Sequence, residues 1–175
     1  NAQTNEIIKV KKKKLLVGAA IGTNQEDLNR AKSLIDNGVD LIVIDTAHGH
    51  SYKVLTILSK LKKLNNNIPI CVGNIATSEA AKELYNSGAD IIKVGIGPGS
   101  ICTTRMVAGI GVPQITAIMD VKKVLKKKKI KIISDGGIKF SGDIAKALAA
   151  GADGIMMGSI FAGTDESPGK KFKDK

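Results

Sequence analysis

The sequence has few aromatic residues, few cysteines and no long hydrophobic run. Aromatic residues make up 3% of the 175 positions, so the stacking surfaces that bind single-stranded nucleic acids are lacking. Two cysteines cannot form a disulfide framework, which favours a reducing cytoplasmic setting. Apolar runs such as 15–21 and 41–44 are far shorter than the roughly 18 residues of a membrane-spanning helix. Residues 1–14 are polar and basic and do not resemble a signal peptide. We therefore expect a cytoplasmic protein without a membrane partner.

Positive charge is in excess, with 27 lysines and arginines against 16 acidic residues and a net charge of +11. Only Arg30 and Arg105 are arginines, and lysine runs such as 126–129 stand apart from any groove-reading motif. The favoured interpretation is a solvated lysine-rich surface. A nucleic-acid partner is the less favoured alternative.

An internal repeat dominates the organisation of the chain. Residues 37–44, 87–94 and 150–157 each place a glycine and an aspartate before a short apolar run. The glycine suits the left-handed end of a helix, and the run has the length of a β-strand. With the similar runs at 15–20, 68–72 and 130–134, the pattern predicts six strands that begin near residues 15, 40, 69, 90, 130 and 153.

Helical patterns at 25–37, 78–86, 114–126 and 141–150 separate these strands. Alternation of apolar strands with helices predicts an α/β fold with a parallel sheet covered on both faces. An open doubly wound sheet and a TIM barrel would both fit this pattern. The barrel is favoured because the last two predicted strands end in small-residue turns at 135–137 and 158–159, where (β/α)8 barrels commonly bind phosphate. We predict a (β/α)8 TIM barrel with about six of its eight units in residues 15–169, preceded by a basic linker-like segment at 1–14 and followed by a basic tail at 170–175.

The loop 95–105, after the fourth predicted strand, is the main candidate for chemistry. Its glycines permit close approach of the backbone to a ligand or ion. Cys102 lies there among hydroxyl-bearing residues and near Arg105, which are surroundings typical of a reactive thiol. We predict Cys102 as a nucleophile. Cys71 lies in an apolar strand and is predicted to be a buried structural residue.

Two aspartates and two histidines are further candidates. Asp45 and Asp135 end predicted strands at the same mouth of the barrel, where each carboxylate could bind ribose hydroxyls or be a helix-cap or turn residue. The residues alone leave both interpretations open. His48 and His50 have no third metal ligand at a suitable spacing, so we expect them to be loop residues.

Four stretches, 97–105, 111–114, 135–138 and 161–169, resemble the IMP dehydrogenase/GMP reductase family, and the resemblance spans about residues 15–169. It implies the NAD-dependent oxidation of inosine 5′-monophosphate (IMP) to xanthosine 5′-monophosphate, in guanine nucleotide synthesis. GMP reduction with NADPH is the alternative. It is less favoured because GMP reductases lack the pattern at 158–159 and 163–169.

The resemblance also implies roles for individual residues. Cys102 and Thr104 are expected to be catalytic. The IMP-binding residues are expected to be Ser100, Asp135, Gly136, Gly137, Gly158 and Ser159. The NAD side is expected to comprise Asp45, Thr46, Ala47, Gly95, Ile96 and Gly97. Backbone carbonyls of Gly97, Gly99 and Cys102 are expected to bind potassium, with further ligands from a neighbouring subunit of a homotetramer.

Members of the family also have two further barrel strands, usually a pair of CBS modules, and a C-terminal flap that activates water. The present sequence contains none of these segments. We therefore expect this chain alone to be incomplete and inactive.

Overall fold

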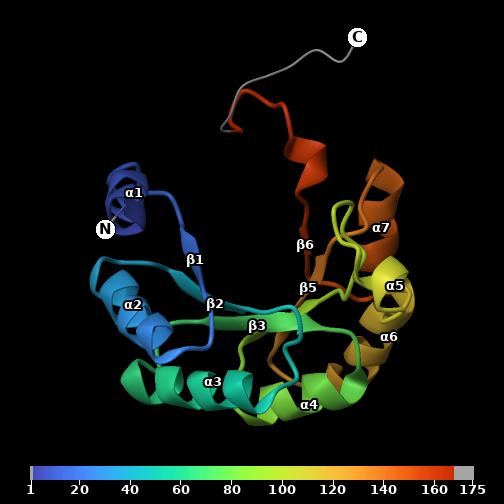
Figure 1. The fold of residues 1–175 in the computed structure, drawn as a ribbon, viewed down its shortest axis with the longest axis horizontal. Helices are drawn as coiled ribbons and strands as arrows, with labels where there is room; N and C mark the ends of the chain where they lie inside the picture. Colours follow the sequence, from blue (N-terminus) through green and yellow to red (C-terminus); the bar gives the residue numbers. More distant parts are fainter. Residues whose placement is uncertain (1, 168–175) are drawn as a thin grey trace.

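Six parallel strands form a curved sheet in the computed structural model, which describes residues 2–167. The strands follow one another in chain order across the sheet: β1 (Gly18–Ile21), β2 (Leu41–Asp45), β3 (Ile70–Ile75), β4 (Ile91–Val94), β5 (Lys131–Asp135) and β6 (Gly154–Met156). Figure 1 shows the strands on the inside of an arc and the helices on its outside. A parallel sheet that curls in this way, with one helix layer, is part of a TIM barrel. The predicted fold class is confirmed.

The helices that connect the strands lie along the outer side of the arc (Figure 1): α2 (Gln25–Asp36), α3 (Tyr52–Leu64), α4 (Ser78–Asn86), α6 (Gln114–Leu125) and α7 (Ser141–Ala150). Helix α1 (Ala2–Lys12) precedes β1, the short α5 (Thr104–Val107) lies between β4 and α6, and a 3-10 turn, η1 (Ser159–Phe161), follows β6. Helices α2, α4, α6 and α7 match the four predicted helical segments. Helix α3 was not among the predicted helices; it begins where the Ser51 hydroxyl accepts the backbone N–H of Val54 at 3.4 Å. No helix within residues 2–167 combines the length and the apolar character needed to cross a membrane.

The N-terminal segment differs from its prediction. Residues 2–12, expected to be part of a linker-like segment, form helix α1. Two contacts explain the difference: Ile7 is buried against the core, and the Lys11 ammonium donates to Asp40 at 2.7 Å. Leu15 and Leu16, expected at the start of the first strand, precede β1 and are exposed. The predicted tail at 170–175 and the last two residues of the predicted barrel segment, Pro168 and Gly169, lie outside the described residues.

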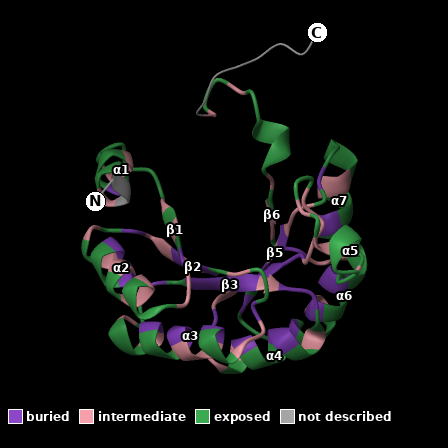
Figure 2. Cartoon of the chain, viewed as in Figure 1, coloured by how far each residue is buried: buried purple, intermediate pink, exposed green. Residues whose placement is uncertain are grey.

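Burial along the strands shows that helices cover one face of the sheet. In β2, Ile42 and Ile44 are fully buried, whereas Leu41 and Val43 are half-buried and Asp45 is exposed. Because side chains alternate between the faces of a strand, we infer that the buried set faces the helices and the other set faces the inside of the arc. The expectation of a sheet covered on both faces was therefore wrong for the outer strands. In the centre of the arc, β3 is buried on both faces apart from Asn74. Figure 2 shows this strand mostly in the colour of buried residues.

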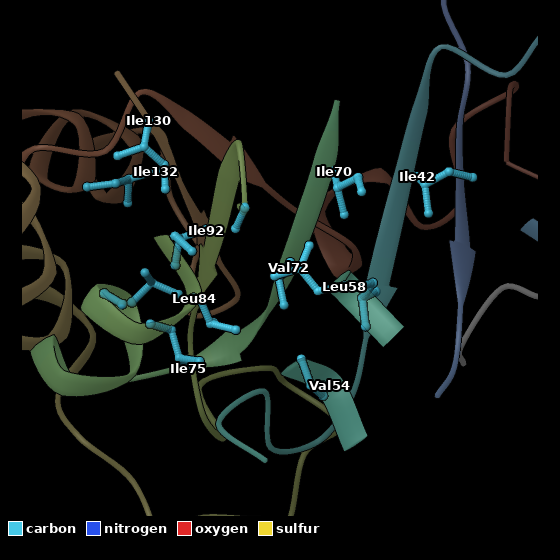
Figure 3. Close-up of a cluster of buried hydrophobic side chains, with 14 of the residues drawn as sticks. Ile42, Val54, Leu58, Ile70, Val72, Ile75, Leu84, Ile92, Ile130 and Ile132 are labelled. Carbon is cyan, nitrogen blue, oxygen red and sulfur yellow. The ribbon is translucent and has the colours of Figure 1, made fainter. Parts of the chain in front are cut away.

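The apolar core lies between the strands and the helices. Figure 3 shows Ile70, Val72 and Ile92 of the central strands near Leu58 of α3 and Leu84 of α4. All five side chains are fully buried. This packing fixes the backbone of the strands, and with it the position of the loops that begin where the strands end.

Candidate functional site

A cavity of about 360 Å³ lies at the carboxyl ends of β2 to β5. Its lining residues come from these strand ends and from the loop that follows β4: Asp45, Thr46, Ala47, Asn74, Lys93, Gly95, Ile96, Gly97, Pro98, Gly99, Cys102, Thr104, Asp135 and Gly136. Ligand sites of TIM-barrel enzymes lie at this end of the strands. The cavity is therefore the candidate active site.

Most of the residues predicted to form a site line this cavity. Eleven do so: Asp45, Thr46, Ala47, Gly95, Ile96, Gly97, Gly99, Cys102, Thr104, Asp135 and Gly136. Four predicted substrate-binding residues do not line it: Ser100, Gly137, Gly158 and Ser159. Asn74 and Lys93 also line the cavity but were not predicted as site residues. Lys93 carried a recognisable signal, since it is a lone charge within an otherwise apolar strand.

Cys102 and Thr104 form the reactive corner of the cavity. The Cys102 thiol donates to the Thr104 hydroxyl, with the two atoms 3.2 Å apart. Hydrogen bonds from the Thr104 side chain and backbone stabilise the thiolate, and with a contribution from the charge of Arg105 they lower the pKa of Cys102 against the opposing effect of burial. Cys102 is half-buried and therefore reachable from the cavity. This arrangement suits a nucleophile.

Cys71 has the opposite environment. Its side chain is fully buried in β3. Burial raises the pKa of the Cys71 thiol to about 12, so the group stays protonated and inert at neutral pH. The structure agrees with the prediction that this cysteine is a core residue.

Lys93 joins the two aspartates that the sequence placed at strand ends. Its ammonium donates to Asp45 at 2.9 Å and to Asp135 at 2.7 Å. Burial by itself would lower the pKa of Lys93, but the hydrogen bonds and charges of the two carboxylates outweigh it and raise the pKa. The alternative interpretation of these aspartates as helix caps is wrong, because the helices that follow them, α3 and α7, have Ser51 and Phe140 as their N-cap residues.

Asn74 supplies a further polar group to the cavity. Its amide nitrogen donates to the Gly95 carbonyl at 2.8 Å and to Asp135 at 2.9 Å. Its amide oxygen is buried and has no hydrogen-bond partner among residues 2–167. Because an unsatisfied buried acceptor is costly, this oxygen is suited to a ligand that donates a hydrogen bond.

Glycine and arginine fix the shape of the loop after β4. Gly95 has a φ of +150°, and a Cβ atom there would lie 2.1 Å from the carbonyl oxygen of Asp135, so only glycine fits. Arg105 donates to the carbonyl of Ile96 at 3.0 Å and to that of Val112 at 2.5 Å. It thereby holds together the two ends of the loop that carries Cys102.

The two small-residue turns lie at the same end of neighbouring strands, because Asp135 of β5 is in register with Met156 of β6. Gly136 packs against the loop after β4: a Cβ atom at this position would lie 3.0 Å from Pro98 and 3.1 Å from the amide nitrogen of Gly99. The structure thus places the turn at 135–137 next to the loop 95–105, which carries Cys102. Gly158 and Ser159 are exposed and remain a predicted part of the substrate site.

A second, mainly apolar cavity of about 490 Å³ adjoins the first. The two share Ala47, Ile96 and Thr104, and the second extends over Ile75, Ala76 and Val112. A polar cavity beside an apolar one suits a ligand with both a sugar and a planar ring.

The histidines lie in the loop between β2 and α3, as the sequence predicts. His50 contacts Glu83 of α4 at 2.5 Å, and His48 lines the apolar cavity. The structure groups neither histidine with two further acidic, cysteine or histidine side chains within the described part of the chain.

Three comparisons with known proteins point to one family. The family model for the IMP dehydrogenase / GMP reductase domain matches residues 3–175. Inosine-5′-monophosphate dehydrogenase from Chlorobaculum parvum is 57% identical over 157 residues, which are 90% of this chain and 32% of that protein. The protein of the same name from Cryptosporidium parvum is 60% identical over 160 residues, covering 91% of this chain and 39% of that protein.

A solved structure of GMP reductase from Trypanosoma brucei in complex with guanosine 5′-monophosphate superimposes with a TM-score of 0.87 at 48% identity. The match covers 89% of this chain and 33% of that one. The chain therefore spans about a third of the length of these relatives.

Proposed function

Because the chain belongs to the IMP dehydrogenase/GMP reductase family, we propose that it carries the nucleotide-oxidising site of an NAD-dependent IMP dehydrogenase. The observation that supports this most directly is the half-buried Cys102 thiol, hydrogen-bonded to Thr104 at the edge of a polar cavity. The curated relatives at 57% and 60% identity bear this name. Acting on IMP, the site would produce xanthosine 5′-monophosphate for guanine nucleotide synthesis.

In the proposed reaction, the Cys102 thiolate attacks C2 of the purine and a carbon–sulfur bond forms. The hydrogen on C2 then leaves with its electron pair as hydride. Bound NAD would supply the acceptor for that hydride. Water adds to C2 of the resulting thioimidate, the carbon–sulfur bond breaks, and the Cys102 thiolate is regenerated with release of one proton. Thr104 stabilises the thiolate at the start and at the end, because it donates hydrogen bonds to the sulfur.

In this proposal, Asp135 lies on the side of the cavity that binds IMP, and Asp45 lies on the side that binds NAD. Asp135, with Gly136 and Gly137 beside it, would bind the ribose of IMP, while Ser100, Gly158 and Ser159 would bind its phosphate. Asp45, Thr46 and Ala47, with residues 95–97, would form the NAD side. The unpartnered oxygen of Asn74 and the adjoining apolar cavity fit an amide-bearing planar ring.

A potassium ion and a homotetramer belong to the same proposal. The carbonyls of Gly97, Gly99 and Cys102 offer the oxygen atoms that such a cation prefers, and the loop is curled by the Cys102 N–H, which donates to the Gly99 carbonyl at 3.1 Å. Beside them, Ile101, Met106 and Val107 are more than 80% exposed. An apolar patch of this kind fits a surface covered by a neighbouring subunit.

GMP reductase is the second candidate, because the solved structure from Trypanosoma brucei has that activity in its name and shares 48% identity. The test uses the longest form of the protein in which these 175 residues occur. It is incubated with IMP and NAD, or with GMP and NADPH. We expect NADH and xanthosine 5′-monophosphate from the first pair and no NADPH consumption with the second. Ammonia and IMP from the second pair, without reaction of the first, would replace the proposal with its alternative.

The 175-residue chain alone is expected not to sustain turnover. Strands β1 and β6 each pair with one neighbouring strand, and most residues of these two strands are half-buried or exposed. Steady NADH production by the isolated chain would contradict this expectation.

A further inference from the structure

The Lys93 ammonium is the most deeply buried charge in the described part of the chain. Its side chain is 4% exposed, and it binds Asp45, which is 52% exposed, and Asp135, which is 23% exposed. A buried ammonium is costly unless it is paired and hydrogen-bonded. Here two carboxylates from two different strands meet that requirement at once.

The path of the lysine side chain depends on a glycine. Asp45, Gly73 and Lys93 are in register on the adjacent strands β2, β3 and β4. A Cβ atom at Gly73 would lie 2.6 Å from the Cβ of Lys93. Because Gly73 has no side chain, Lys93 can pass over β3 and reach Asp45, two strands away.

The partners of Lys93 belong to the two sides of the cavity. Asp135 also accepts a hydrogen bond from Asn74 at 2.9 Å, so its carboxylate is held from two directions. Thr46, which follows Asp45, donates its hydroxyl to the Gly73 carbonyl at 2.9 Å. Lys93, Gly73 and the two aspartates therefore form one connected group at the strand ends that line the cavity.

We propose that Lys93 is a positioning residue shared by both halves of the site, which holds Asp45 and Asp135 in place so that the nucleotide and the cofactor are bound by one common ion-pair network. This inference rests on the proposed function. It predicts that the two halves are coupled, since a change at one carboxylate alters how Lys93 holds the other.

Three titratable groups face the Lys93 ammonium from the elements around it: Asp45 of β2, Asp135 of β5 and the buried thiol of Cys71 on β3. The thiol stays neutral, so the network contains two negative charges and one positive charge. Without the lysine, the two carboxylates would repel each other and their positions would no longer be fixed.

The first measurement needs no ligand. NMR titration of the Lys93 side chain in the free protein is expected to show a pKa above the ordinary value of 10.5, and the D45N and D135N variants are each expected to lower it. A Lys93 pKa that neither variant moves would overturn the shared ion pair. This arm is independent of the nucleotide that the site binds.

The second measurement uses the same longest form of the protein as the activity test. It compares the binding of IMP, 2′-deoxy-IMP and NAD by calorimetry in the wild type, Lys93→Met, Lys93→Arg and Lys62→Met. Lys62→Met removes a comparable lysine–aspartate pair, with Asp90 at 2.6 Å, away from the cavity lining. Because hydrogen bonds to charged groups are lost, we expect Lys93→Met to weaken the binding of IMP and of NAD by about tenfold or more and to lose the preference for IMP over its deoxy form. Lys93→Arg should restore part of the affinity and part of the preference for IMP. Lys62→Met should change neither the affinities nor that preference by more than about twofold.

The outcomes separate the two proposals. Equal weakening of IMP and 2′-deoxy-IMP in a folded Lys93→Met protein would show a merely structural role and overturn the inference. If Lys93→Met does not fold, D45N serves instead. An unchanged ratio of IMP to 2′-deoxy-IMP affinity in D45N would overturn the inference. Failure of the wild type to bind IMP, with the NMR result as expected, would contradict the proposed function and leave the ion-pair network established.

Discussion

The carboxylate of Asp90 accepts the backbone N–H of Ile70, with the two atoms 2.8 Å apart, and so joins the beginning of β4 to the beginning of β3. The same contact occurs twice more: Asp40 accepts the backbone N–H of Val17 at 2.8 Å, and Asp153 accepts that of Ile132 at 3.0 Å. Each of these three aspartates is the one in the sequence repeat, and each also pairs with a lysine. The repeat therefore encodes a clamp between neighbouring strands, placed at the end of the sheet opposite the candidate site.

We expect removal of one clamp to destabilise the fold and leave the site chemistry intact. In Asp153→Asn the charge-assisted hydrogen bond to Ile132 is weakened, and the free energy of unfolding in urea should fall by about 1 kcal/mol. Asp36→Asn, at an exposed position at the end of α2, should have no effect and is the control. An equal loss in both variants would contradict the clamp.

The stability conferred by Asp153 should depend on pH. Burial alone would raise its pKa, but the hydrogen bonds from Lys131 and from the Ile132 backbone outweigh burial and hold the pKa below the ordinary value of 3.8. A carboxyl group whose pKa is lowered by folding stabilises the fold above its unfolded pKa. The stabilisation should therefore be complete above about pH 5 and disappear as the pH falls below 3.8. In urea titrations, the difference between wild type and Asp153→Asn should shrink over that range, and a constant difference down to pH 2 would contradict the argument.

The two cysteines should differ sharply in reactivity. We expect iodoacetamide at pH 7 to alkylate Cys102, whose pKa is lowered by hydrogen bonds from Thr104, and to spare buried Cys71 until the protein unfolds. An electrophilic IMP analogue should label the same residue, and IMP should protect it. Peptide mass spectrometry reports both sites. Equal labelling, or labelling that IMP does not slow, would exclude Cys102 as the nucleophile.

Thr104 should control the pH dependence of that alkylation. In Thr104→Val the hydroxyl that stabilises the thiolate is lost, so the pKa of Cys102 should rise and the rate at pH 7 should fall severalfold. At a pH well above 9 the two rates should converge, because both thiols are then ionised. Thr103→Val is the matched control, since the Thr103 side chain caps no helix. If Thr103→Val shifts the pH dependence of Cys102 alkylation as far as Thr104→Val does, the effect belongs to the loop as a whole and not to the Thr104 hydroxyl.

Gly95 should be the least replaceable glycine of the candidate site. In Gly95→Ala the new Cβ would lie 2.1 Å from the Asp135 carbonyl oxygen, so either β5 or the loop must move. We expect a loss of about 3 kcal/mol or more in the free energy of unfolding, with slower alkylation of Cys102. Gly142→Ala, where nothing lies within 4 Å of the built Cβ, should be neutral or slightly stabilising. Normal stability of Gly95→Ala would show that the close approach to Asp135 is not needed.

The sequence alone determined the features that depend on neighbouring residues. Alternation of strands and helices, the repeat with its glycine and aspartate, and the carboxyl ends at Asp45 and Asp135 are local patterns, because hydrophobic periodicity and helix termini act over a few residues. The surroundings of Cys102 were also readable, since Thr104 is two residues away. Helix α3 was equally local and was missed, although Val54, Ile57, Leu58 and Leu61 have helical spacing.

The tertiary structure alone decided which distant residues share the site. Lys93 reaches Asp45 across 48 positions of sequence and Asp135 across 42, and it does so only because the parallel register places Gly73 between the strands. The same holds for Asn74, which contacts Asp135 across 61 positions. Strand register and sheet curvature arise from packing over the whole chain, so no local pattern could show that one buried ammonium joins two carboxylates.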